Sequence, residues 1–111
     1  MIAAAEFSMH RTPSRSAVRP FVIVLQSDDF ARMPTRAVAP LVRPDAMPQF
    51  GNEHARFAPR LVVQGQGYAL SHFYFVTMSV HRLGERVASF AGDDEAKRRI
   101  QDALDIVVKP V

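Results

Sequence analysis

The residues of this chain best suited to bind a metal ion are four histidines: His10, His54, His72 and His81. No pair of them has the His-x-x-x-His spacing that places two imidazoles on one face of a helix, and there is no cysteine to complete a zinc site. The sequence therefore predicts no metal centre and no cofactor. We interpret the histidines as polar surface or loop residues.

Two pairs of aspartates are the candidates for acid–base chemistry. Asp28 and Asp29 are neighbours, so in a strand their carboxylates would point to opposite faces, and a turn or cap at a strand exit is favoured. Asp102 and Asp105 share one helix face, which is usually the solvated one. The serines lack the Gly-x-Ser-x-Gly context of a nucleophile. These residues therefore predict neither an acid–base pair nor a serine nucleophile.

Short strands are the main elements expected to position these groups. We predict them at residues 7–9, 21–25, 37–42, 61–63, 68–70, 73–78 and 87–90. The second is a continuous apolar, β-branched run, which predicts burial on both faces. Pro40 lies inside the third and cannot donate to a ladder, so we expect an edge strand or a bulge there. The Gly-bearing turn between the fourth and fifth indicates a hairpin. Met33 and Met78 are interpreted as core residues.

One amphipathic helix is predicted at residues 93–108. Its apolar positions form a single stripe: Ala96, Ile100, Ala103, Leu104 and Val107. Acidic residues at positions 93–95 favour the positive N-terminus of the helix, and Pro110 ends it. Strands followed by one helix predict an α+β, mainly β fold, in which a strongly bent antiparallel sheet packs against the helix.

Length and composition narrow the class of protein. The 111 residues allow one modest core, and we predict a flexible leader at residues 1–6 and a single domain at 7–111. Hydrophobic residues at 48% and charged residues at 23% exclude a largely disordered chain. No segment has the roughly 20 apolar residues that cross a bilayer, and no signal peptide is apparent, so we expect a cytoplasmic protein without membrane contacts. The net charge of +3 is a mild excess, and direct nucleic-acid binding is not expected.

Five segments occur in the order and spacing of a known family. They are PFVIVLQSD at residues 20–28, PTRAVAPLV at 34–42, APRLVV at 58–63, LGERVAS at 83–89 and IQDALD at 100–105. Together they resemble the CcdB family of bacterial toxins, which shares its fold with MazF. The resemblance implies an SH3-like antiparallel β-barrel with a C-terminal α-helix, assembled as a homodimer. It also implies the toxin of a type II toxin–antitoxin system, which poisons DNA gyrase through its A subunit, is neutralised by a CcdA-like antitoxin and is not a catalyst.

The resemblance also implies a gyrase-binding surface. Carried over by position, its residues are Ser27, Asp29, Phe30, Asp105, Lys109, Pro110 and Val111. Well-studied members of the family end in Trp-Gly-Ile, with the tryptophan stacked on a gyrase arginine. The lysine of this chain offers no aromatic face, and its proline restricts the terminal backbone. We therefore expect gyrase poisoning to be weakened, lost or redirected.

Two alternative functions stay open. Arg19-Pro20 before an apolar strand resembles the Arg-Pro opening of the MazF-type ribonucleases, in which the arginine acts at the scissile phosphate. Their partner threonine corresponds here to Val42, which has no hydroxyl, and the simpler interpretation of Arg19 is a solvated residue where the strand starts. The second alternative is a CcdB-like binding module that no longer poisons its target.

Charge predicts how an antitoxin would associate. Antitoxins of this class are partly disordered and often acidic. The arginines expected on the toxin surface are Arg11, Arg15, Arg19, Arg32 and Arg36. Opposite charges would mainly increase the association rate, and salt would slow it.

Overall fold

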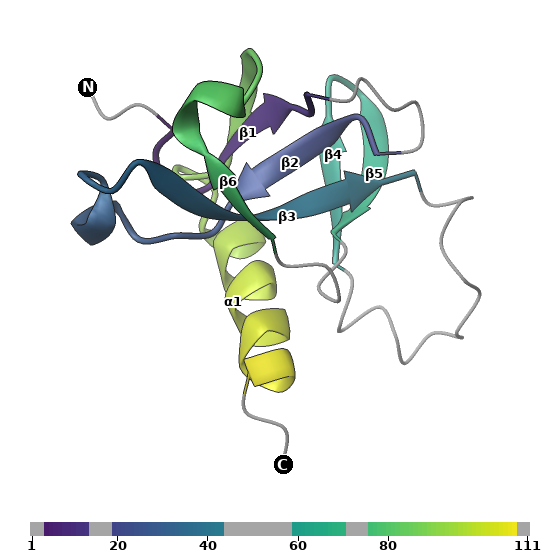
Figure 1. Cartoon of the computed structure of the whole chain (residues 1–111). Coiled ribbons are helices and arrows are strands. Elements are labelled where there is room, and N and C mark those ends of the chain that lie inside the picture. Colours follow the sequence, from purple (N-terminus) through teal and green to yellow (C-terminus); the bar gives the residue numbers. More distant parts are fainter. Residues whose placement is uncertain (1–3, 14–18, 44–58, 71–75, 109–111) are drawn as a thin grey trace.

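The apolar runs of the sequence form a curled antiparallel sheet with one helix beside it. A computed structural model describes residues 4–13, 19–43, 59–70 and 76–108. Its strands are β1 (Ser8–Arg11), β2 (Phe21–Val24), β3 (Thr35–Val42), β4 (Arg60–Val63), β5 (Gln66–Leu70), β6 (Val76–Ser79) and β7 (Arg86–Ser89). Its helices are the short 3₁₀ turns η1 (Asp28–Phe30) and η4 (Val80–Arg82) and the α-helix α1 (Asp94–Val108). The predicted α+β, mainly β class, with a barrel-like sheet and a C-terminal helix, is confirmed (Figure 1).

The sheet order brings distant segments together. The described strands pair in the order β4-β5-β3-β2-β1-β7, and β6 pairs with β3 as well. All of these pairs are antiparallel. One edge of β3 is thus shared by two strands, β6 along its first half and β5 at its end. This sharing lets the sheet curl, and Figure 1 shows β6 crossing in front of β3.

The prediction that Pro40 marks an edge strand or a bulge is wrong, because β3 lies inside the sheet in unbroken register with β2. The N–H of Leu25 donates to the carbonyl of Ala37 at 2.9 Å, and hydrogen-bonded pairs alternate along an antiparallel ladder. Three residues further along β3, the nitrogen of Pro40 therefore faces away from β2. On that side the β6 pairs end at Val38 and the β5 pairs begin at Leu41. Pro40, which has no N–H to donate, therefore lies at a position of β3 that pairs with neither β6 nor β5.

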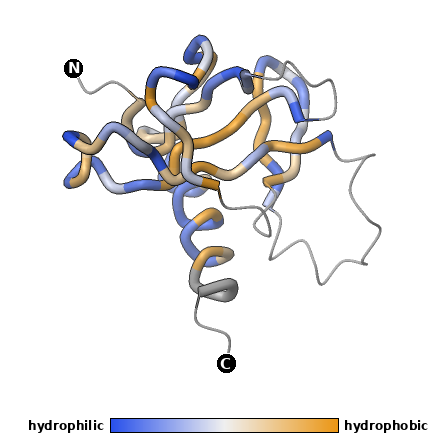
Figure 2. Tube along the Cα trace, in the orientation of Figure 1, coloured by the Kyte–Doolittle hydropathy of each residue, from blue (hydrophilic) through white to orange (hydrophobic). Residues whose placement is uncertain are grey.

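Strand β2 has a hydrophobic cluster on each face, as its continuous apolar run predicts. Phe21 and Ile23 belong to the larger cluster, which also holds the buried stripe of α1. Val22 and Val24 pack with Val38 of β3 in a smaller cluster on the other face. Figure 2 shows hydrophobic residues concentrated in the middle of the sheet, whereas hydrophilic and hydrophobic residues alternate along α1. Both faces of β2 are therefore buried.

Helix α1 begins at the predicted acidic cap. The side chain of Asp93 accepts a hydrogen bond from the N–H of Ala96 at 3.0 Å, and its carbonyl accepts one from Lys97 at 3.0 Å. Ala96, Ile100 and Ala103 are at most 1% exposed, which confirms the predicted stripe as far as side chains are described. No helix in the described ranges is long and apolar enough to span a bilayer.

The predicted hairpin is confirmed as β4 and β5. Gln64 and Gly65 form its two-residue turn with φ of 51° and 79°. Positive φ at both central residues is the geometry that matches the twist of the flanking strands, and glycine adopts it without a steric penalty. Of the strand predicted at 73–78, β6 covers the last residues, and 73–75 lie outside the described ranges.

Part of the predicted leader is described. The carbonyl of Ala4 accepts a hydrogen bond from Arg36, and the N–H of Glu6 donates to Asp28 at 2.8 Å. Residues 1–3 lie outside the described ranges. The division into leader and domain stays a prediction.

Candidate functional site

The segment that follows β2 forms an exposed turn, η1, where three of the predicted site residues meet. Ser27 is its N-cap, and its hydroxyl accepts a hydrogen bond from the N–H of Asp29 at 3.1 Å. A carboxylate oxygen of Asp28 accepts the N–H of Glu6, which ties the turn to the N-terminal segment. The interpretation of Asp28 and Asp29 as a turn at a strand exit is confirmed. Ser27, Asp29 and Phe30 therefore lie together.

The loop from η1 to β3, residues 27–35, presents two large apolar side chains to solvent. Phe30 is 57% exposed and Met33 is 49% exposed. The prediction that Met33 is a core residue is wrong, whereas Met78 is partly buried against the smaller cluster as predicted. An isolated exposed apolar residue needs no explanation, but two of them on one short loop form a candidate contact for another protein, because exposed aromatic and methionine side chains are enriched at interfaces.

The same loop carries charges of both signs, because Asp28, Asp29 and Arg32 are all exposed. Burial raises the pKa of Glu6 above its ordinary value, and the carboxylates of Asp28 and Asp29 raise it further, while Lys97 opposes them. Asp28 and Asp29 are both exposed. A partner that covers Phe30 would therefore meet the charged groups of Asp28, Asp29 and Arg32 beside an apolar surface.

Of the remaining predicted site residues, the structure describes only the backbone of Asp105. Asp105 lies in α1, and its side chain is outside the described part of the structure, as are Lys109, Pro110 and Val111. Asp105 is eleven residues beyond the start of α1, about 16 Å along the helix axis. In Figure 1 the last turns of α1 are far from the blue η1 turn at the left. One chain therefore does not bring Asp105 next to η1.

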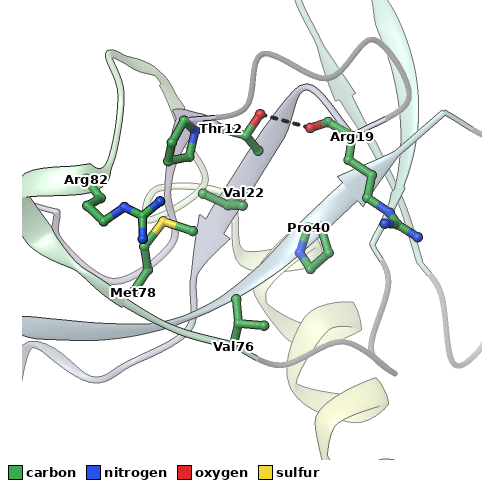
Figure 3. Close-up of a pocket in the computed structure, with 8 residues that line it drawn as sticks. Thr12, Arg19, Val22, Pro40, Val76, Met78 and Arg82 are labelled. Atoms are coloured by element: carbon green, nitrogen blue, oxygen red, sulfur yellow. Dashed lines mark hydrogen bonds between the residues drawn. The ribbon is translucent and has the colours of Figure 1, made fainter.

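A second candidate site is an open groove of about 450 Å³ on the outer face of the sheet (Figure 3). Its described lining consists of Thr12, Pro13, Arg19, Val22, Pro40, Val76, Met78 and Arg82. Figure 3 shows Val22 and Pro40 in the middle, with Arg19 and Arg82 on opposite sides. These lining residues include no histidine or carboxylate, so they offer apolar contact and positive charge but no acid–base pair.

The ribonuclease alternative needs Arg19 and a hydroxyl group that could bind a phosphate together, and Arg19 lines this groove. Arg19 is exposed, as expected of a solvated residue before the strand, while Val42 is 4% exposed in β3. The hydroxyl of Thr12, which lines the groove, donates to the carbonyl of Arg19 at 3.0 Å. Neither Val42 nor this engaged hydroxyl is arranged to donate to a phosphate oxygen.

The histidines are spread over the fold. His10 is only 7% exposed, so its interpretation as a surface residue is wrong. Its Nδ1 donates to the carbonyl of Gly84 at 3.0 Å, and its Nε2 lies 2.9 Å from the hydroxyl of Ser8. His81 is exposed in η4, and His54 and His72 lie outside the described residues. Within the described ranges, no three His, Asp or Glu side chains gather as metal ligands do.

Arg36 is the residue that sequence reasoning placed incorrectly on the basic surface. It is 4% exposed, and its guanidinium donates to backbone carbonyls of the η1–β3 loop. Its position two residues before the buried Val38, on the same face of β3, is the only sequence signal of this burial. Arg11, Arg19 and Arg32 are exposed, and Arg15 lies outside the described residues.

Comparison with known families adds one result to this geometry. A family model described as CcdB protein matches residues 6–109. No curated protein matches the chain. The matched range includes η1, the curled sheet and α1, and agrees with the resemblance that the five sequence segments carry.

Proposed function

Because the chain belongs to the CcdB protein family, we propose that it is the toxin of a type II toxin–antitoxin pair and that it binds the A subunit of DNA gyrase. The family match over residues 6–109 is the observation that carries the proposal, since it spans nearly the whole chain. The family is one of gyrase-directed toxins. We extend to this chain a homodimer, a cytoplasmic location and neutralisation by a CcdA-like antitoxin.

The η1–β3 loop is the proposed centre of the gyrase contact, through Ser27, Asp29 and Phe30. The exposure of Phe30 and Met33 supports this assignment, since a binding energy usually depends on a few large side chains. The remaining proposed contacts are Asp105 of α1 and the C-terminal residues Lys109, Pro110 and Val111, and they rest on the family resemblance alone. No catalytic group is needed, because the toxin acts by binding.

The first experiment measures poisoning directly. Purified protein is incubated with gyrase and plasmid DNA, and the fraction of linear, cleaved DNA is quantified. Phe30→Ala should weaken the effect by roughly tenfold or more, as expected of an interface anchor. Val62→Ala is the matched control, because Val62 is 67% exposed on β4, at the opposite end of the sheet from η1. Equal effects of the two changes would argue against the η1 assignment.

The terminal lysine provides the second experiment. Lys109→Trp restores an aromatic face and should strengthen gyrase poisoning relative to the natural chain. Growth arrest on induction of the two genes is the cellular readout. If both proteins fold and dimerise but neither stalls gyrase, the chain is a binding module rather than a gyrase poison. RNA cleavage that Arg19→Ala abolishes would instead establish the ribonuclease alternative.

A further inference from the structure

Arg36 is a buried cation that is held by backbone carbonyl groups. Its Nε donates to Ala4 at 3.1 Å, Nη2 donates to Ala31 at 2.9 Å, and Nη1 donates to Met33 at 2.6 Å and Thr35 at 2.9 Å. Removing a charge from water is costly unless its donors are satisfied, and the planar guanidinium carries five N–H donors in a fixed fork. These bonds are therefore what keeps Arg36 inside at 4% exposure.

The carbonyl groups bound by Arg36 come from three places in the chain. Ala4 lies in the N-terminal segment, Ala31 and Met33 lie between η1 and β3, and Thr35 begins β3. Ala4 also packs against the smaller hydrophobic cluster of Val22, Val24 and Val38. A single side chain thus fastens the middle of the η1–β3 loop to the sheet and to the N-terminal segment.

The ends of this loop have other attachments. The side-chain amide of Gln26 donates to the carbonyls of Phe30 and Thr35 at 3.2 and 3.3 Å, and its oxygen accepts the N–H of Ala37 at 3.2 Å. Gln26 therefore links the end of η1 to the start of β3, while Arg36 binds the carbonyls of Ala31 and Met33 between these two points. With these two carbonyls directed inward, the side chains of Phe30 and Met33 remain exposed on the outer side.

We propose that Arg36 is a positioning residue, which holds the η1–β3 loop in the conformation that presents Phe30 and Met33 to the partner protein. The partner is gyrase only if the proposed function holds, so this inference rests on it. Lysine cannot replace arginine here, because one ammonium group cannot reach carbonyls spread around a planar fork.

The test compares Arg36→Lys with Val24→Ala, a change in the smaller hydrophobic cluster that keeps the Arg36 guanidinium bound to the loop carbonyls. Val24 is fully buried, so its truncation provides a general loss of stability. Affinity for the gyrase A subunit is measured under conditions where both variants are fully folded. Arg36→Lys should weaken binding at least tenfold, and Val24→Ala less than threefold. Similar losses in both variants would reduce Arg36 to an ordinary stabilising residue and overturn the proposal.

A double-mutant cycle with Phe30→Ala separates positioning from stability. If Arg36 acts through the loop, Arg36→Lys should cost little further affinity once Phe30 has been removed, and the two effects should be far from additive. Full additivity would contradict the proposal. Arg36→Gln, which is uncharged and keeps an amide donor, serves as the second variant if the lysine variant does not fold.

Limited proteolysis tests the loop without gyrase. Arg32 is exposed within the loop, and trypsin cleaves after arginine, so release of the loop should accelerate cleavage there at least tenfold in Arg36→Lys relative to Val24→Ala. If the natural chain does not bind gyrase but this acceleration occurs, the proposed function fails and Arg36 still positions the loop. An unchanged cleavage rate overturns the role of Arg36 whatever the partner is.

Discussion

At the scale of single residues, Gly84 shows how closely β1 approaches the segment before β7. A Cβ added to Gly84 would lie 2.7 Å from the carbonyl oxygen of Arg11, to which the N–H of Gly84 donates at 3.0 Å. Gly84→Ala must therefore displace backbone rather than a flexible side chain. We expect a loss of about 1–3 kcal/mol in the free energy of unfolding, measured by urea denaturation.

Gly92 provides the matched control for this substitution. A Cβ added there meets no atom within 4 Å, and Gly92 does not have a positive φ. Gly92→Ala should leave stability unchanged or raise it by up to about 1 kcal/mol, because alanine restricts the unfolded chain. Equal losses in the two variants would show that the contact with Arg11 is not the cause.

Glu6 makes a pH-dependent contribution beside η1. Burial and the carboxylates of Asp28 and Asp29 raise its pKa, so the folded chain retains this proton to a higher pH than the unfolded chain. Between the ordinary and the raised pKa the folded state binds more protons, and stability falls as pH rises. Glu6→Gln should therefore have a higher melting temperature than the natural chain at pH 7.

The advantage of Glu6→Gln should shrink as the pH falls from the raised pKa of Glu6 towards about 4.3, and it should be lost at lower pH, where the glutamate is protonated in both the folded and the unfolded chain. Glu85→Gln removes the same charge at an exposed position, whereas Glu6 is partly buried, and it controls for net charge. A difference between Glu6→Gln and the natural chain that persists unchanged at low pH would exclude this explanation.

The two polar residues that sequence reasoning misplaced, His10 and Arg36, share a physical cause. Such side chains are usually exposed, and each of these two has one carbonyl partner that is distant in sequence: Gly84 is 74 residues from His10, and Ala4 is 32 residues from Arg36. Their other partners, among them Ser8 for His10 and Met33 for Arg36, are local. Alternation within a strand suggested which face they occupy, but only the fold brings carbonyl groups to them. The turn at Asp28 was predictable because its hydrogen bonds are mostly local.

At the scale of elements, the start of α1 depends on one cap. Asp93 accepts the N–H of Ala96, one of the four amides that a helix leaves without an internal partner. Asp93→Ala should lower the free energy of unfolding by about 0.5–2 kcal/mol, and Asp93→Asn should retain most of it. Chemical denaturation of the three proteins gives the comparison.

Asp94→Ala is the control for this cap. Asp94 is 98% exposed, and its ion pair with Lys97 is 3.5 Å long, so its contribution is expected to be a few tenths of a kcal/mol. If Asp94→Ala destabilised the chain as much as Asp93→Ala, the local negative charge rather than the cap would stabilise the helix.

The elements differ in how far the sequence alone predicted them. Helix α1, the β4–β5 hairpin and the doubly buried β2 follow from local patterns and were predicted correctly. The interior position of β3 was not, because Pro40 is tolerated there only through the change of partner from β6 to β5. That change is a property of the whole sheet. The contacts proposed at Lys109, Pro110 and Val111 rest on the family resemblance alone.

At the scale of the whole molecule, charge is unevenly distributed. The chain carries a net +3, and three of its acidic residues, Glu6, Asp28 and Asp29, lie around η1, where Arg32 is exposed as well. Other exposed arginines include Arg19 and Arg82 on either side of the groove. An acidic antitoxin would therefore be attracted to the groove side of this small protein.

This distribution leads to a prediction for the antitoxin. If the partner is acidic, its association rate should fall at least tenfold between 50 mM and 500 mM salt, because screening acts on the encounter, while the dissociation rate should change much less. Stopped-flow fluorescence measures both rates.

Arg36 is buried and should not contribute to this long-range attraction beyond its share of the net charge. Arg11→Gln should slow association more than Arg98→Gln, the same charge change on α1, if the arginine surface near β1 steers the partner. An association rate that is constant across this salt range would exclude electrostatic steering, whatever the affinity of the complex.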